Sequence, residues 1–508
     1  MRRYFFYLIV FCACIQLSCG YATRPLPVVT IKGHPAECKP GHLDHVLPCY
    51  LTEKEPDFQW TQESKQTEII KIDDNNHQVK KYSLKLVSLR WRQGEKDQVD
   101  MPIWQHRLTI YIPEKVTIDT ALLYIDGGII NQTENNKIPV RDNGLDFPRI
   151  AARSQSVVID LKDVPNQFLR FGNGEPLRED NLIAYTWSRF MTNPVENANW
   201  PLRMPMVKAV VSAMNASQEM LKEKKLAINN FVISGASKRG WTAWLVASMD
   251  TRVTAVIPIV ADFLNLTKVF QHLFRVYPQG NPSIAAYMPI RHMIGTDPMN
   301  KLLSIIDPYQ YRHLLTMPKY AISASGDSFL PPDISQFFFP DLLGRKWLRV
   351  LPNINHYVFN ADPNIVSEAV ESFYGAFIKA MPIPELTWKY EQGTLNLSSS
   401  VLPKSARLWQ ASNSEARDFR QTKDNVHASD FVATPLKFTC DKNCTLAINL
   451  PAPKKGWNAS FAEVSYGNPP YQDLVFTTRL IITPDHYPES EPSDGNVIPQ
   501  VTNNNLSK

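Results

Sequence analysis

The sequence has no strong excess of charge of either sign: 54 Lys and Arg residues against 49 Asp and Glu residues leave a net charge of +5 over 508 residues. A charge this small does not call for nucleic acid or an anionic membrane as a partner. Glycine is scarce, with 20 residues against 39 prolines, which indicates many rigid turns. The hydrophobic fraction of 44% is ordinary for a globular chain and excludes wholesale disorder. Because a chain of this length exceeds one compact core, we expect two or more units.

Long hydrophobic runs are also missing, apart from a short one at the N-terminus. Arg2 and Arg3 precede an apolar stretch over residues 4–17, and small residues follow over residues 18–22. This is the pattern of a secretory signal peptide, predicted over residues 1–22. An uncleaved anchor is the alternative, although the run is shorter than the about 20 residues of a membrane span. The sequence therefore predicts a secreted or periplasmic protein with no membrane contact after the signal is removed.

Cysteine is scarce, and three of the seven residues lie in the predicted signal. The remaining four are Cys38, Cys49, Cys440 and Cys444. An even number in an exported chain predicts disulfides, and proximity favours Cys38–Cys49 and Cys440–Cys444 among three connectivities. Zinc bound by Cys440 and Cys444 is the alternative, but no His pair stands nearby at finger spacing. We expect no metal and no cofactor.

Apolar strand-like segments alternate with helical segments through the middle of the chain, which predicts a mostly parallel sheet with helices on both faces. Residues 264–306 interrupt this alternation and predict a helical cap. Short alternating segments after residue 382 predict an all-β, sandwich-like module. The predicted units are a polar, irregular N-terminal lead-in (23–80), the α/β domain (81–382), the β module (383–485) and a disordered tail (486–508).

The sharpest local motif is FVISGASKRGW (231–241), whose first four residues are strand-like. A serine on a tight strand-to-helix turn presents its hydroxyl above the sheet, so Ser237 is the candidate nucleophile. The usual pattern is G-x-S-x-G, and this chain has Arg239 at the second position after the serine, with Gly240 one residue later. A serine that caps an ordinary helix is the alternative interpretation.

A serine nucleophile needs a base and an acid, which follow it in the order Ser, Asp, His on this fold. Asp327 follows the strand-like residues 320–324, and His356 follows residues 347–351. Both are therefore expected at the same sheet edge as Ser237. Asp262, which follows residues 253–260, is the alternative acid and a candidate substrate-binding residue.

Backbone amides that could stabilise an oxyanion come from two places. The amide of Lys238 directly follows the serine, and those of Gly127 and Gly128 follow a strand that ends at Asp126. Two cations at a helix N-terminus oppose the helix dipole. Lys238 and Arg239 are therefore also candidates for binding a substrate carboxylate or a peptide C-terminus.

Four stretches carry a resemblance to a known family: NWPLRMPMVKAVVSAM (199–214), SGASKRGWTAWLVASMDTRVTAVIPIV (234–260), DPYQYRHLLTMPKYAISASGDSFLPP (307–332) and LRVLPNINHYV (348–358). They resemble the PhoPQ-activated pathogenicity-related protein family, which includes the autocrine proliferation repressor proteins. The resemblance covers roughly residues 75–380, with a looser match beyond. It implies an α/β-hydrolase fold in exported proteins, with Ser237, Asp327 and His356 at the triad positions.

Two classes of function follow from these observations. The first is a secreted serine hydrolase that cleaves an ester or a peptide bond in a small molecule or peptide. The second is a non-catalytic binding or signalling protein on a hydrolase scaffold, whose β module docks a receptor or a glycan. The apolar residues of the predicted cap would line a pocket over the site or pack the core of the cap; they are Phe263, Phe270, Phe274, Tyr277 and Tyr287.

Overall fold

The computed structural model describes residues 30–39, 41–92, 98–130, 144–278, 280–422, 425 and 428–488. The predicted signal peptide and residues 489–508 of the predicted tail lie outside these ranges. Within them, no helix has both the length and the apolar character needed to cross a bilayer.

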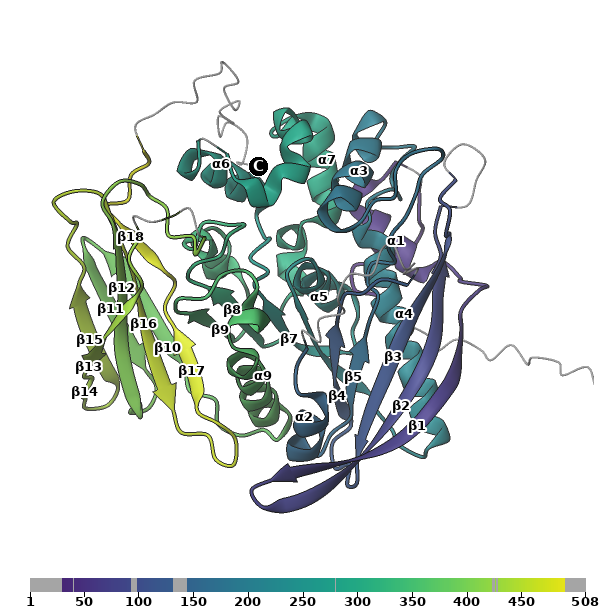
Figure 1. Cartoon of the computed structure of the whole chain (residues 1–508), viewed down its shortest axis with the longest axis horizontal. Coiled ribbons are helices and arrows are strands. Elements are labelled where there is room, and N and C mark those ends of the chain that lie inside the picture. The colour runs from purple at the N-terminus through teal and green to yellow at the C-terminus, as the bar shows by residue number, and fades with distance from the viewer. Residues whose placement is uncertain are drawn as a thin grey trace, which may run out of the picture.

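A nine-stranded sheet forms the centre of the molecule, with strand order β1-β2-β3-β5-β4-β6-β7-β8-β9 (Figure 1). Neighbours from β5 to β9 are parallel, whereas β1, β2 and β3 join the sheet as an antiparallel ribbon. The strands are β1 (Gln59–Ile72), β2 (Asn75–Arg90), β3 (Ile103–Pro113), β4 (Thr120–Ile125), β5 (Val158–Leu161), β6 (Asn230–Ala236), β7 (Val253–Ile259), β8 (Lys319–Ala324) and β9 (Lys346–Leu351).

Helices cover both faces of this sheet, because the central strands are apolar on both sides. In β6, Phe231 and Ile233 pack into one core cluster together with residues of α4 and α5. Val232, which points the other way, packs into a second cluster with residues of α2 and α9. The helices of the α/β domain are α1 (Val46–Thr52), α2 (Phe147–Ser154), α3 (Glu179–Thr192), α4 (Arg203–Glu223), α5 (Lys238–Met249), α8 (Val358–Ala361) and α9 (Pro363–Ile378).

The predicted N-terminal lead-in is wrong for its second half. Residues 59–72 form β1, and β2 begins at residue 75, so this stretch belongs to the central sheet. The strand is hard to recognise because most of its residues are exposed. An edge strand needs only one partner and can carry polar side chains on its open sides. With β1 and β2 outside it, β3 lies inside the sheet and not at its edge.

The segment between β7 and β8 forms the predicted cap. Figure 1 shows its helices α6 and α7 above the sheet, with α7 beside α3. The cap consists of α6 (Leu266–Val276), the 3-10 segment η3 (Pro282–Met293), α7 (Asp297–Ile306) and the short η4 (Pro308–Leu314). An insertion between β5 and β6 completes the roof, since α3 packs against both η3 and α7. This second contribution to the roof was not predicted.

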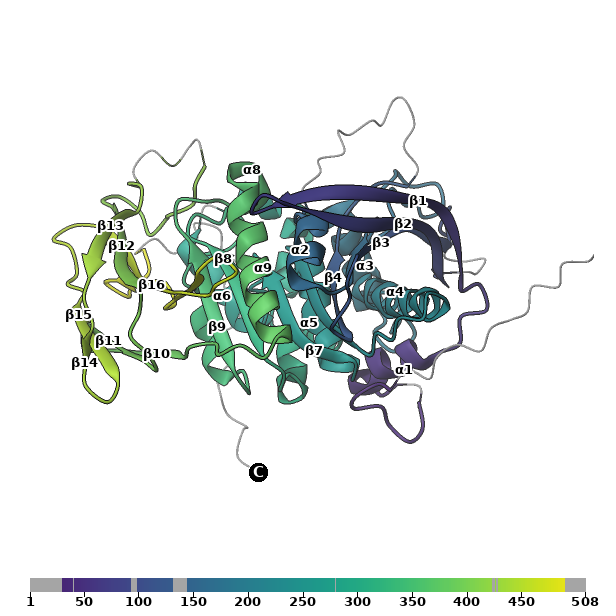
Figure 2. The ribbon, with the colours of Figure 1, turned by 90° about the horizontal axis from the view of Figure 1, so that it is seen from below.

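The C-terminal module is a pair of antiparallel sheets, which lies beside β9 and α9 (Figure 2). This confirms the predicted fold class, an α/β-hydrolase domain with a β-rich module. The strands are β10 (Leu386–Glu391), β11 (Thr394–Ser399), β12 (Ser405–Asn413), β13 (Val432–Leu436), β14 (Thr439–Cys440), β15 (Cys444–Asn449), β16 (Trp457–Tyr466), β17 (Leu474–Thr477) and β18 (Ile481–Thr483).

Both predicted disulfides form, and the start of the predicted tail contacts the cap. Cys38 is bonded to Cys49 and Cys440 to Cys444, the pairing expected from proximity. The prediction of a disordered tail from residue 486 is wrong for its first residues. The Tyr487 hydroxyl lies 2.8 Å from Nδ1 of His272 in the cap. A tyrosine suits such a contact because its ring can be buried while its hydroxyl makes a hydrogen bond.

Candidate active site

Ser237 lies on a sharp turn between β6 and α5. Its backbone has φ 55° and ψ −125°, a conformation that non-glycine residues rarely adopt. Such strain costs of order 1–3 kcal/mol and persists only where the surroundings enforce it. Here the two glycines allow it. A Cβ on Gly235 would lie 2.9 Å from the backbone of Arg239, and one on Gly240 would lie 2.5 Å from Cβ of Ala261. The turn therefore forms although its second glycine is one residue later than in the usual motif.

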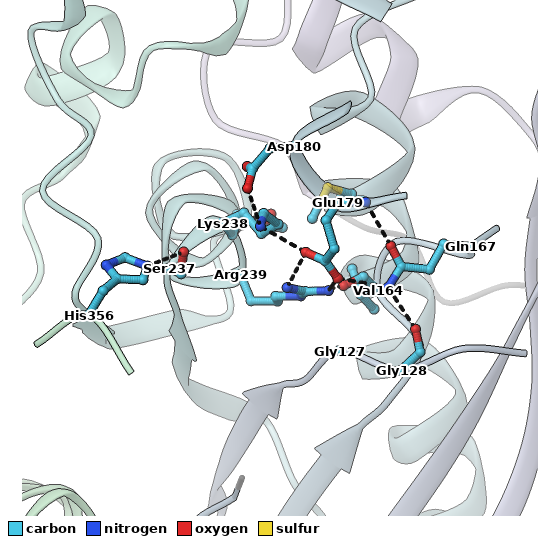
Figure 3. A network of polar contacts seen from close by, with 12 residues as sticks. Gly127, Gly128, Val164, Gln167, Glu179, Asp180, Ser237, Lys238, Arg239 and His356 are labelled. Carbon is cyan, nitrogen blue, oxygen red and sulfur yellow. Dashed lines mark hydrogen bonds and ion pairs between the residues drawn. The ribbon is translucent and has the colours of Figure 1, made fainter. Parts of the chain in front are cut away.

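Ser237, His356 and Asp327 form a continuous hydrogen-bonded line. His356 Nε2 lies 2.7 Å from Oγ of Ser237 (Figure 3), and its Nδ1 lies 2.7 Å from Oδ2 of Asp327. Because a carboxylate only accepts, Nδ1 carries the proton, and Nε2 is left to accept from the serine hydroxyl. The other oxygen of Asp327 accepts from the amides of Phe329 at 2.7 Å and Leu330 at 3.3 Å. Both the acid and the base are buried.

Asp262, the alternative acid, is held elsewhere. Its Oδ2 accepts a hydrogen bond of 2.7 Å from the hydroxyl of Ser323 on β8, whereas Nδ1 of His356 is bonded to Asp327. Burial raises the pKa of Asp262 to about 7, and the negative charge of Asp327 raises it further, against the hydrogen bond from Ser323. The geometry therefore favours Asp327 as the acid and leaves Asp262 as a buried neighbour of the triad.

The candidate oxyanion donors follow the ends of two strands, β4 and β6. These strands are parallel neighbours, so their ends lie side by side. Lys238 is the first residue of α5, so its amide has no acceptor within the helix and borders the cleft beside Ser237. The amide of Gly127 is instead engaged by Oδ1 of Asp126 at 2.7 Å. Gly128 is left as the candidate second donor. A Cβ on Gly128 would lie 2.0 Å from Asp163, so only glycine fits there.

The cations that follow the serine are paired inside the protein, which differs from their predicted role in binding a substrate carboxylate. Arg239 donates to both oxygens of Glu179, at 3.0 and 2.7 Å, and to the carbonyl of Val164 at 2.6 Å (Figure 3). Lys238 Nζ lies 2.8 Å from Glu179 and 3.3 Å from Asp180. The two acids open α3, where negative charge is favourable at a helix N-terminus. The sequence feature that could have indicated this pairing is that the two acids, Glu179 and Asp180, are consecutive residues.

Glu179 also links the nucleophile turn to the glycine loop. Gln167 Nε2 donates to Glu179 at 2.7 Å and to the carbonyl of Gly128 at 2.8 Å. Burial alone raises the pKa of Glu179, but the charges of Arg239 and Lys238 outweigh it and hold that pKa well below its ordinary value. The network therefore depends on an ionised Glu179.

Replacement of Glu179 by glutamine is expected to lower the free energy of unfolding by about 1–3 kcal/mol at pH 7, because two cations lose their carboxylate. Since the folded-state pKa is depressed, this stabilisation is present above the unfolded-state pKa of about 4.3 and is lost as the pH falls below it. Urea unfolding between pH 7 and pH 3.5 measures the difference. Glu175→Gln, an exposed change in the same loop, is the control; a difference independent of pH would contradict the electrostatic explanation.

Two cavities meet at Ser237. A wide cleft of about 800 Å³ is bordered by Ser237, His356, Gly127 and Gly128. A smaller, mainly apolar pocket of about 60 Å³ lies under the cap and also reaches Ser237. Of the cap aromatics noted in the sequence, Tyr277 packs elsewhere, beneath the guanidinium of Arg420 at 4.0 Å. The other four line the apolar pocket: Phe263, Phe270, Phe274 and Tyr287.

The β module contacts the loops that carry the acid and the base. The amide of Gln421 donates to the carbonyl of Gly326 at 2.9 Å, directly before Asp327. Asn353, in the loop before His356, exchanges two hydrogen bonds with the backbone of Phe431, at 2.9 and 2.7 Å. The module therefore supports two of the three triad positions.

Asp333 joins the cap to the β module. It starts the short 3-10 helix Ile334–Phe337 but makes no side-chain cap bond there. One oxygen lies 2.9 Å from Nε2 of His272 on α6, and the other accepts from Arg417 at 2.6 Å. The side chains of Asp333, Arg417 and His272 are each only 2% exposed. We call these three residues the cap clamp.

The sheet order, the elbow at the end of β6 and the acid and base after β8 and β9 define a protein of the α/β-hydrolase fold. Solved structures that align with it include an acetyl xylan esterase from Paenibacillus (13% identity, TM-score 0.41, 69% of this chain and 97% of that chain). A glucuronoyl esterase from Solibacter usitatus aligns similarly (12% identity, TM-score 0.36, 64% of this chain and 91% of that chain).

Within this fold, the chain belongs to the PhoPQ-activated pathogenicity-related protein family, whose model matches residues 47–420. It is also 34% identical over 440 residues to autocrine proliferation repressor protein A of Dictyostelium discoideum, an alignment that covers 82% of this chain and 87% of that protein. The family predicted from the sequence motifs is thereby confirmed.

Proposed function

We propose that this protein is a serine hydrolase that cleaves an ester or amide bond through an acyl-enzyme. The observation that carries the proposal is the line Ser237–His356–Asp327, with both hydrogen bonds at 2.7 Å and the serine on a strained turn. A strained serine that only capped a helix would accept a hydrogen bond from the first turn of α5, and Ser237 makes no such bond.

In this mechanism, Oγ of Ser237 attacks the acyl carbon while Nε2 of His356 takes its proton. The amides of Lys238 and Gly128 donate to the oxyanion. The bond to the leaving group then breaks, and His356 passes the proton to the departing oxygen or nitrogen. Water, deprotonated by His356, then attacks the acyl carbon of the ester on Ser237. The bond from that carbon to Oγ breaks, the acyl group leaves as a carboxylic acid, and His356 returns its proton to Oγ of Ser237. Asp327 holds the imidazole in the required tautomer throughout.

The compartment belongs to the same proposal. We infer that the protein acts outside the cytosol, in the secreted or periplasmic space. The two disulfides support this, because such bonds persist in oxidising compartments. The basic and apolar start of the sequence supports it as well.

Labelling with a fluorophosphonate probe tests the catalytic proposal. The wild-type protein is expected to be labelled under native conditions, and Ser237→Ala is expected to lose the label completely, because the attacking oxygen is gone. Ser283→Ala is the control, since Ser283 borders the same cleft and should leave the labelling unchanged. An unlabelled wild-type protein would refute the enzyme and favour the alternative, a binding or signalling protein on this scaffold.

A further inference from the structure

A buried arginine borders the apolar pocket beside Ser237. Arg203 opens α4 and is 1% exposed. Four charged residues line this pocket: the cations Arg203, Lys238 and Arg291, and the acid Asp180. Lys238 is already paired with Glu179 and Asp180. An apolar pocket of about 60 Å³ needs no charge for its own packing, so the buried charge of Arg203 calls for a separate explanation.

Arg203 differs from its neighbour Arg239 in having no carboxylate partner among the described residues. One guanidinium nitrogen donates to the carbonyl of Lys238 at 2.9 Å and lies 3.3 Å from the sulfur of Met206. The guanidinium plane lies 4.2 Å from the ring centre of Trp241. Within the described part of the chain, the buried Nε–H has no hydrogen-bond partner. Several donors of this cation therefore remain available.

This placement is unfavourable for a residue with only a packing role. A buried cation is destabilising unless it is paired, and a cation in the first turn of a helix opposes the helix dipole. Burial lowers the pKa of Arg203 to about 10, so the side chain is still charged at neutral pH. An anionic ligand in the pocket would supply the missing partner.

The position of the base indicates which half of a substrate enters this pocket. His356 borders the wide cleft and must reach the leaving atom to protonate it, so the leaving group belongs in the cleft. His356 does not line the apolar pocket, which also reaches Ser237 and is therefore left for the acyl arm. Its volume of about 60 Å³ holds an arm of about four to six non-hydrogen atoms, since a water-sized group needs about 10–15 Å³.

We propose that Arg203 binds a carboxylate at or near the end of the acyl arm, so that the preferred substrates are esters or amides of short, apolar acyl groups that carry one negative charge. This inference rests on the proposed serine-hydrolase function. It assigns to Arg203 the carboxylate recognition that the sequence assigned to Lys238 and Arg239.

Two fluorophosphonate probes that differ only at the end of a short alkyl arm, carboxylate against methyl, test this assignment. The wild-type protein is expected to react at least about tenfold faster with the carboxylate probe, the range of a charge-assisted hydrogen bond. Arg203→Met, which keeps much of the volume, is expected to remove the preference, so that the carboxylate and methyl probes react at rates within about threefold of each other. Arg203→Lys should retain part of the preference because it retains the charge.

Equal rates of the two probes on the wild-type protein would overturn the proposal without any variant. An equal slowing of both probes in Arg203→Met would also overturn it, because it would indicate that Arg203 has a structural role in holding Lys238. In either case labelling of Ser237 by the methyl probe would leave the proposed hydrolase function intact. Failure of both probes on the wild-type protein would instead refute the hydrolase itself.

Discussion

Replacement of Asp327 by asparagine is expected to reduce kcat/KM, or the rate of fluorophosphonate labelling, by about 10³–10⁴-fold. The asparagine amide can donate a hydrogen bond to Nδ1 of His356, which would then carry no proton. The proton would move to Nε2, where it blocks acceptance from the Ser237 hydroxyl. The side chain keeps its shape and can still accept from the amide of Phe329, so the expected loss is in the chemistry and not in folding.

Asp262→Asn is the matched control for this prediction. Asp262 is a second buried carboxyl after a neighbouring strand, but it is bonded to Ser323 and not to the imidazole. We expect its replacement to change the labelling rate by less than about tenfold. Equal losses in the two variants would show that the two carboxyls act together, and a larger loss in Asp262→Asn would reverse the assignment of the acid.

The same control has a pH signature in stability. Burial raises the pKa of Asp262 to about 7, above its unfolded-state value of about 3.9. The folded protein therefore holds this proton more tightly, and the associated stability is lost as the pH rises through about 7. This loss begins near the unfolded-state pKa of about 3.9 and levels off above about pH 7. Asp262→Asn should therefore gain stability relative to wild type as the pH rises from about 4 to about 7, as measured by urea unfolding.

Loss of Arg417 from the cap clamp is expected to have the largest effect on stability. Arg417→Met leaves the carboxylate of Asp333 buried without its cation, with His272 and the side-chain amide of Gln336 as its remaining partners. Breaking a buried ion pair in this way typically costs about 3–5 kcal/mol. Burial alone raises the pKa of Asp333, but the charges of His272 and Arg417 outweigh it and hold that pKa far below its ordinary value. The single variant should therefore unfold at markedly lower urea concentration.

The double variant Arg417→Met/Asp333→Leu separates a lost ion pair from lost packing. Replacement of a whole buried pair by apolar residues is often close to neutral, so the double variant should recover much of the lost stability. Lys404→Met, which removes the exposed partner of Asp473, should cost less than about 1 kcal/mol. A double variant less stable than Arg417→Met would contradict this account of the clamp.

These contacts change the interpretation of the β module. The sequence predicted a module that docks a receptor or a glycan. In the structure, its residues reach the acid loop through Gln421, the base loop through Phe431 and the cap through Arg417. The family match likewise extends to residue 420, past the α/β domain and into the module. A role in supporting the active site is therefore built into the fold, whatever else the module binds.

The sequence alone was sufficient for the class of fold and for the three residues of the proposed triad. Both depend on local order: apolar strands buried on two faces, and a polar residue directly after a strand, which parallel pairing brings to one sheet edge. Ser237, Asp327 and His356 could be recognised in this way because each follows its own strand within a few residues. The exposed strand β1 was missed because it lacks this apolar signature.

Only the tertiary structure decided which charges are paired and which are not. Lys238 and Arg239 looked free in the sequence, but Glu179 and Asp180, some 60 residues earlier, neutralise them. Arg203 could not be singled out from the sequence, and among the described residues it is a buried cation beside Ser237 with no carboxylate in hydrogen-bond contact. Pairing of charges depends on distances of a few ångströms between segments far apart in the chain, which no local pattern encodes.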